Sequence, residues 1–171
     1  MNVNFLNPFV NAAFEVIQAE AGITSQRGDL TLERVPYRTE DITVIIGLVG
    51  SVEGTVFYSM DQKTAMFLVS KMLGEEITVI DRLAQSGISE LANVITGRAS
   101  VLLSESGFEA TISPPALIIG KDAIISTLDF PRLIVPLMME TGQLRIHLAL
   151  REGKNNQLKA SQIAVPSAPS I

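Results

Sequence analysis

The feature that most constrains this chain is an apolar strand–glycine–strand pattern that occurs twice. Residues 44–58 contain β-branched and aromatic segments separated by a turn from Gly50 to Gly54, and residues 133–146 repeat the hydrophobic pattern around Gly142. Each segment predicts a β-hairpin. Because a helical pattern precedes each hairpin, the repeat indicates an ancient duplication. It predicts an α+β fold in which long helices pack on one face of an antiparallel sheet.

Turn and capping residues divide the chain into further elements. The predicted helices run from Asn7–Pro8 to Gly22, from an Asp61 cap to Gly74, and from near Asp81 to Gly107. The predicted strands are 29–37, 42–49, 55–60, 110–112, 117–119, 124–128, 133–139 and 144–150. Residues 1–151 are predicted to form one domain. Residues 152–171, rich in Ser, Ala, Gln, Asn and Pro without apolar periodicity, are predicted to be a flexible tail.

Composition excludes several functional classes. The chain has 13 basic and 18 acidic residues, a net charge of −5, which argues against nucleic-acid binding because that needs a basic face. It has no cysteine and only one histidine, which excludes thiol chemistry, disulfides and histidine-rich metal sites. The longest apolar stretch, 43–50, is far shorter than the roughly 20 residues that span a bilayer. We therefore expect a cytoplasmic protein without membrane insertion.

The third predicted helix carries an unusual outer face. At about 100° per residue, its apolar side chains form one stripe, and small or polar side chains form the opposite one. The apolar stripe comprises Ala84, Ile88, Leu91, Ile95, Ala99 and Leu102, and the opposite stripe comprises Ser86, Glu90, Asn93, Gly97, Ser100 and Ser104. Solvated helix faces usually carry long charged residues. A flat strip on which Glu90 and Asn93 project one turn apart suits the close approach of another backbone.

Two other interpretations of this face stay open on the residues alone. A Glu-x-x-Asn pair on an exposed helix is common and usually has no function. The serines and the glycine also suit packing against a neighbouring helix of the same chain.

The string from Ser86 through Glu90 and Asn93 to Arg98 resembles the CheC/CheX/FliY family of chemotaxis phosphatases, and most closely its CheX-like members. The twin prolines Pro114–Pro115, about twenty residues beyond Asn93, match the spacing in those members. The resemblance covers roughly residues 5–151, including the first helix, the 47–54 turn and the strand around His147.

The resemblance implies dephosphorylation of a phosphorylated CheY-type receiver. Glu90 would pair with the receiver's active-site lysine, and the Asn93 amide would orient the water that attacks the aspartyl phosphate. Ser86, Gly97 and Ser100 would belong to the docking face for the receiver. The protein would need no cofactor of its own, since Mg²⁺ belongs to the receiver. Alternatives are a non-catalytic receiver-binding module, as in flagellar-switch relatives, and a protein that sequesters the receiver without turnover.

Departures from the family pattern refine these expectations. CheC-like members carry two Glu-x-x-Asn sites, whereas here Pro8 stands three residues before Asn11, so one site per chain is expected. The resemblance also implies a homodimer formed through sheet edges, for which the Pro114–Pro115 segment is a candidate because proline favours edge strands. His147 shares a strand face with Arg145 and is expected to be solvated or paired at the surface, without a catalytic role.

Overall fold

The computed structural model describes residues 3–127 and 130–153 of the 171-residue chain. The helices are α1 (Leu6–Ala21), α2 (Gln62–Leu73) and α3 (Arg82–Glu105), with a short 3₁₀ helix, η1 (Val3–Phe5), before α1. The strands are β1 (Gln26–Arg27), β2 (Thr31–Glu33), β3 (Tyr37–Arg38), β4 (Ile42–Gly50), β5 (Val52–Met60), β6 (Ala110–Ile112), β7 (Ala116–Ile119), β8 (Ile124–Ile125), β9 (Arg132–Met139) and β10 (Gly142–Glu152).

Two long hairpins form the centre of the main sheet. The strand order is β1-β9-β10-β5-β4-β6, with β2 also beside β9 and β7 also beside β4, and every pairing is antiparallel. The inner strands of the hairpins, β5 and β10, pair with each other from Val52–Glu152 to Ser59–Arg145. This arrangement confirms the predicted α+β class and places the two repeated segments side by side.

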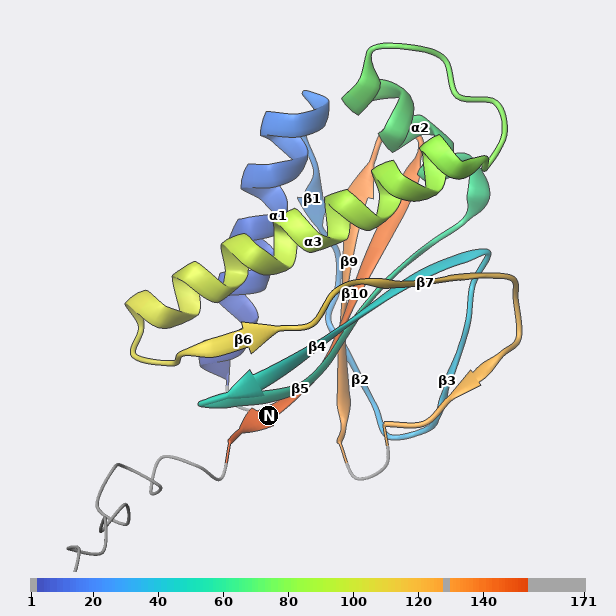
Figure 1. Ribbon diagram of the computed structural model, residues 1–171. Coiled ribbons are helices and arrows are strands. Elements are labelled where there is room, and N and C mark those ends of the chain that lie inside the picture. The colour runs from blue at the N-terminus through green and yellow to red at the C-terminus, as the bar shows by residue number, and fades with distance from the viewer. Residues whose placement is uncertain (1–2, 128–129, 154–171) are drawn as a thin grey trace, which may run out of the picture.

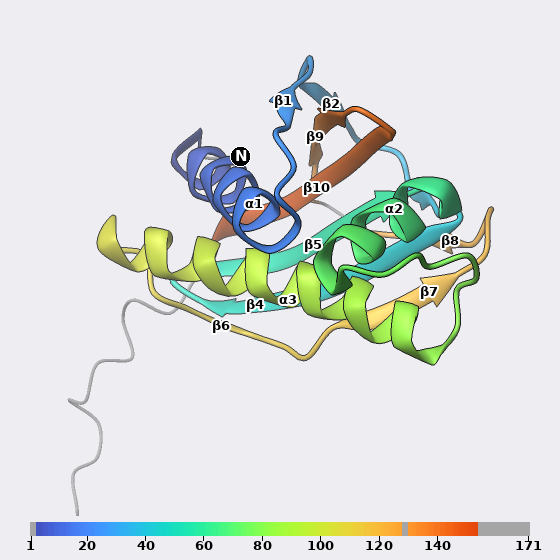
Figure 2. The same cartoon turned by 90° about the horizontal axis from the view of Figure 1, so that it is seen from above.

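The three helices pack against one face of this sheet (Figure 1). The sheet is curved, and α1 lies between α3 and the β9–β10 hairpin when the molecule is seen from above (Figure 2). Alternation along the strands turns every second side chain toward the helices. In β10 these are Leu144, Ile146, Leu148 and Leu150, none of them more than 2 % exposed. The predicted core face of this strand is therefore confirmed.

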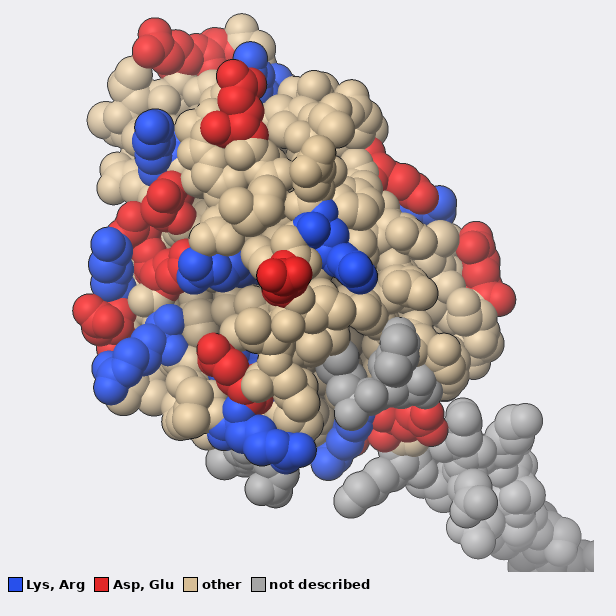
Figure 3. Space-filling model, turned by 180° about the vertical axis from the view of Figure 1, so that it is seen from behind, with Lys and Arg blue, Asp and Glu red and all other residues tan. Residues whose placement is uncertain are grey.

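The opposite face of the sheet is partly covered by a second, two-stranded sheet made by β3 and β8. Tyr37 of β3 stacks on Phe57 of β5 with 5.5 Å between ring centroids, and both rings are buried. Acidic and basic side chains are interleaved over the side of the molecule away from α3 (Figure 3). Where the β3–β8 sheet covers the main sheet, this side of the molecule has two layers of strands, which the sequence pattern did not predict.

Gly54, predicted at the end of the turn, lies inside β5, because β4 ends at Gly50 and β5 begins at Val52. Glycine is required there by the pairing of β5 with β10. The φ of Gly54 is +137°, and a Cβ added there would lie 2.1 Å from the carbonyl oxygen of Ala149 on β10. A side chain at this position would separate the two central strands of the sheet.

Several predicted boundaries differ from the structure. Helix α1 begins at Leu6, and its N-cap residue, Phe5, makes no side-chain capping bond, so the cap predicted at Asn7 is wrong. Pro8 lies within the first turn, where a missing N–H costs no helical hydrogen bond. The strand predicted over 29–37 is divided between β2 and β3 because these short strands pair with different sheets.

The C-terminal boundary also shifts slightly. Glu152 is the last residue of β10 rather than the first residue of a tail. The rest of the predicted tail, residues 154–171, and Leu128 at the end of a predicted strand lie outside the described residues.

Candidate active site on helix α3

Helix α3 begins where the sequence predicts. The Asp81 carboxylate accepts a hydrogen bond from the Ala84 backbone N–H at 2.9 Å, which satisfies one of the free donors of the first turn. The buried residues of α3 are Ala84, Ile88, Leu91, Ala92, Ile95, Thr96, Ala99 and Leu103. Leu102, predicted in the core, is only half-buried, and Leu103 is fully buried instead. The core face is displaced because α1 packs against α3 together with the sheet.

The predicted functional face lies on the side of α3 away from this core. Ser86 and Glu90 are exposed, while Asn93, Gly97 and Ser100 are half-buried. Within the described part of the chain, the side chains of Glu90 and Asn93 have no hydrogen-bond or ion-pair partner. Both polar groups are therefore available to another molecule.

Gly87 and Gly97 of α3 differ in whether packing within the chain requires glycine. A Cβ added to Gly87 would lie 2.9 Å from Cγ1 of Val69, so close packing of α2 requires glycine there. A Cβ added to Gly97 would meet no atom within 4 Å. Glycine inside a helix costs about 1 kcal/mol relative to alanine, so intramolecular packing gives no reason for Gly97. The structure thus excludes, at this residue, the interpretation of the small face as a helix-packing surface.

Ser100 stands at the far end of this face. Its hydroxyl donates to the Ala110 carbonyl oxygen of β6 at 2.9 Å, so its hydrogen is engaged within the chain. Ser100 also borders a groove of about 560 Å³ beside the C-terminal half of α3, which includes the exposed Val49 and Val101. The predicted docking face therefore continues into a partly apolar depression.

Arg98 ties this helix to its neighbour. Its guanidinium Nε lies 2.6 Å from a carboxylate oxygen of Glu15 on α1, and both side chains are exposed enough to be screened by solvent. On α1 itself, Asn11 is exposed but Pro8 occupies the position three residues before it. The second Glu-x-x-Asn site of two-site relatives therefore has no counterpart on α1.

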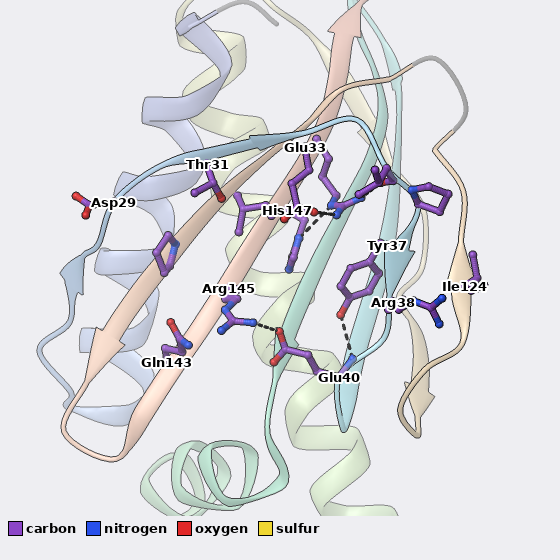
Figure 4. Close-up of a pocket in the computed structure, with 15 residues that line it drawn as sticks. Asp29, Thr31, Glu33, Tyr37, Arg38, Glu40, Ile124, Gln143, Arg145 and His147 are labelled. Atoms are coloured by element: carbon purple, nitrogen blue, oxygen red, sulfur yellow. Dashed lines mark hydrogen bonds and ion pairs between the residues drawn. The ribbon is translucent and has the colours of Figure 1, made fainter.

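A larger cleft, of about 830 Å³, lies on the other face of the sheet, and Glu90 and Asn93 do not line it. Its lining includes Arg132. It also includes His147, Arg145, Glu33 and Glu40, which are labelled in Figure 4. Arg132 is paired with Glu33, and Arg145 is paired with Glu40. These four charges are thus paired within the chain.

His147 is 3 % exposed, so the expectation of a solvated histidine is wrong. The Nε–H of Arg132 donates to His147 Nδ1 at 3.3 Å, which leaves the imidazole proton on Nε2. Nε2 then donates to the Ser59 hydroxyl at 2.9 Å, and Ser59 donates to Glu40 at 3.2 Å. Burial, with the charges of Arg132 and Arg145, lowers the pKa of His147 to about 3. His147 is thus a neutral member of a buried hydrogen-bond network.

Residues 3–127 and 130–153 contain no group of three or more His, Asp or Glu side chains placed to hold a metal ion. Within the same residues, no helix combines the length and the apolar character needed to cross a membrane.

Comparison with known proteins identifies the family. Residues 42–138, more than half of the chain, match the model of the family described as chemotaxis phosphatase CheX. A CheY-P phosphatase CheX of Thermotoga maritima is 27% identical over 154 residues, which cover 90% of this chain and 99% of the relative. The chain belongs to the CheX family of chemotaxis phosphatases.

Solved structures agree with this assignment. A CheC-like superfamily protein from Shewanella sp. PV-4 has a TM-score of 0.80 and 29% identity, covering 88% of this chain and 99% of that one. The CheX chain of a CheX–CheY–BeF₃–Mg²⁺ complex from Borrelia burgdorferi has a TM-score of 0.73 and 32% identity, covering 86% and 98%. In that relative, therefore, a CheX chain is found with a CheY protein and Mg²⁺.

Proposed function

We propose that this protein is a phosphatase that hydrolyses the aspartyl phosphate of a CheY-type receiver in chemotaxis signalling, and that it acts in the cytoplasm. Membership of the chemotaxis phosphatase family supports the activity, and the CheX–CheY complex of the relative supports the substrate. The observation that carries the site is the unpartnered pair of Glu90 and Asn93 on a helix face flattened by Gly97. Such a face lets a receiver bring its phosphorylated aspartate against the two side chains.

The chemistry needs little from the phosphatase. An acyl phosphate is already activated, and its hydrolysis depends mainly on in-line positioning and charge stabilisation. Asn93 accepts a hydrogen bond from the attacking water and donates toward a phosphoryl oxygen, without titrating. Water attacks phosphorus, the bond to the aspartyl oxygen breaks, and inorganic phosphate leaves with the carboxylate restored.

Glu90 supplies the second contact. Its carboxylate lies one turn before Asn93 and is exposed, so it can form an ion pair with the active-site lysine of the receiver. That pair fixes the helix relative to the phosphoryl group. Mg²⁺ is held by the receiver, and the phosphatase contributes no ligand to it.

The direct test is phosphate release from a panel of Mg²⁺-bound, phosphorylated receivers. We expect the wild-type protein to accelerate loss of phosphate from at least one receiver, and the double variant Glu90→Ala/Asn93→Ala to leave that receiver at its intrinsic rate. The double variant should keep its circular dichroism spectrum and Tm, because both side chains lie away from the core. Binding without turnover by the wild-type protein would instead support the non-catalytic receiver-binding module.

We also propose that the protein is a homodimer joined through the edge formed by β6 and β7. Both strands pair with β4 on one side, and they flank Pro114–Pro115 at the end of the strand order. Ile119 of β7 is 52% exposed, so this edge presents a large apolar side chain that a second copy of the chain can cover. Light scattering after size exclusion should give twice the 18.4 kDa mass of one chain. A mass of 18.4 kDa throughout the micromolar range would refute the dimer.

A further inference from the structure

Helix α3 is tied to the main sheet by two side-chain hydrogen bonds among the described residues. One joins Thr96 Oγ1 to the phenol oxygen of Tyr58 on β5 at 2.8 Å, and the other joins Ser100 to the Ala110 carbonyl on β6 at 2.9 Å. The remaining contacts of α3 with the sheet are apolar and have no preferred direction. These two bonds add direction to the apolar packing, so they limit how far the helix can rotate or shift along its axis.

The bond from Tyr58 reaches the turn that carries Asn93. The Thr96 hydroxyl donates to the Ala92 carbonyl oxygen at 2.8 Å, and Ala92 precedes Asn93 directly. Because a threonine hydroxyl has one hydrogen, Tyr58 must be the donor in its bond with Thr96. Two successive hydrogen bonds thus connect Tyr58, at the centre of the sheet, with the peptide group between Ala92 and Asn93.

The location of these two successive hydrogen bonds matches a weak point in the helix. Gly97 follows Thr96 and has no side chain to support the turn, and a threonine bonded to the carbonyl four residues earlier tends to bend a helix. Tyr58 and Thr96 are both buried, at 1% and 0% exposed. The Tyr58–Thr96 hydrogen bond therefore lies beneath the turn of α3 that Gly97 makes less stable.

We propose that Tyr58 and Thr96 are positioning residues that hold the Asn93 amide at the distance and angle that water attack requires. The inference rests on the proposed function, since it assigns an indirect role in the same reaction. Neither residue touches the receiver, so their effect passes through the backbone of α3. A displacement of about 1 Å in a positioned group can lower a rate by about 100-fold.

The first test is kinetic, and it uses the full chain with a phosphorylated receiver that the wild-type protein turns over. We expect Tyr58→Phe to lower kcat by about 10-fold while KM for the receiver changes less than 2-fold, because the docking surface is unaltered. Thr96→Val should give the same split, and Thr96→Ser, which keeps the hydroxyl, should restore most of the lost rate. The double variant Tyr58→Phe/Thr96→Val should be no slower than either single variant.

Tyr37→Phe is the matched control. It also removes a buried hydrogen bond between a tyrosine and a threonine, Tyr37 to Thr43 at 2.9 Å, on the face of the sheet away from the helices. We expect it to lower Tm without changing kcat at a temperature well below Tm. Equal losses of kcat in Tyr37→Phe and Tyr58→Phe would show that the effect is general destabilisation and would overturn the proposal.

The Asn93→Ala background separates this inference from the proposed function. If the two residues act through Asn93, Tyr58→Phe should cause no further loss of rate in Asn93→Ala. If Asn93→Ala itself leaves the rate unchanged, the proposed site is wrong. If Asn93→Ala is slow while folded Tyr58→Phe and Thr96→Val keep the wild-type kcat, the site stands and the positioning role is refuted. Should Tyr58→Phe fail to fold, Thr96→Val and Thr96→Ser decide between these outcomes.

Discussion

Asn93→Ala should lower the catalysed rate of receiver dephosphorylation by about 10²–10³-fold, the effect of losing one preorganised polar group at a reacting centre. The amide has no partner within the described part of the chain, so its hydrogen-bonding capacity is reserved for the water and the phosphoryl group. Phosphate release at saturating receiver measures the loss in kcat. Receiver affinity, measured with a stable mimic of the phosphorylated state, should be nearly unchanged.

Stability provides the control for this variant. Asn93 faces away from the core stripe of α3, and alanine has the higher helix propensity, so Asn93→Ala should fold at least as stably as the wild type. Glu90→Ala is the complementary variant, and it should weaken receiver binding because the pair with the lysine is lost. An Asn93→Ala protein that is folded and fully active would contradict the proposed mechanism.

Acid should destabilise the protein through its single histidine. In the folded state the pKa of His147 is about 3, lowered by burial and by the charges of Arg132 and Arg145, whereas an unfolded histidine titrates near 6.5. Between these values the unfolded chain binds a proton that the folded chain excludes. The contribution of neutral His147 to the free energy of unfolding is therefore complete above about pH 6.5. Below that pH it is lost at about 1.4 kcal/mol per pH unit.

The geometry explains why the folded protein resists this proton. The unprotonated ring nitrogen of His147 is Nδ1, and its lone pair accepts a hydrogen bond from the Nε–H of Arg132 at 3.3 Å. A proton on Nδ1 would face a guanidinium group without solvent between them. Urea denaturation should show the free energy of unfolding falling by about 2 kcal/mol from pH 7 to pH 5.

His147→Asn is the control variant for the acid prediction. Asparagine keeps an acceptor and a donor but does not titrate, so this variant should be less stable at pH 7 and should lose most of the pH dependence between 7 and 5. Because the chain has one histidine, its ring resonance in an NMR titration reports the group directly. A midpoint near 6.5 in the folded protein would show that His147 is solvated and would refute the prediction.

The elements that the sequence predicted well are those determined by local patterns. Helix α3 has an Asp81 cap and an apolar stripe at helical spacing, so its start and most of its core face follow from neighbouring residues. The hairpins follow from alternation and from glycines at turns. The position of Glu90 and Asn93 on the outer side of α3 was predictable for the same reason.

One missed pair had a signal in the sequence. Tyr58 alternates with Val56 and Met60 on the core face of β5, and a buried tyrosine needs a partner for its hydroxyl. In the structure, Thr96 is the one polar side chain of α3 that is fully buried. Pattern alone could indicate that such a partner exists, but it could not identify which residue it was.

Two other errors arose where distant segments meet. His147 is buried because β3 and β8, separated by more than eighty residues in the chain, pair over the back of the sheet with Tyr37 opposite Ile125. Leu103 is fully buried although the predicted stripe omitted it, while Leu102 packs against the core only partly buried, because α1 packs beside α3. The sequence by itself determined the helices, the hairpins and the Glu90–Asn93 face, since local periodicity controls them and aspartate caps set the starts of α2 and α3. Only the tertiary structure decided which polar groups are buried and which partners they have, because burial depends on what long-range pairing brings over them.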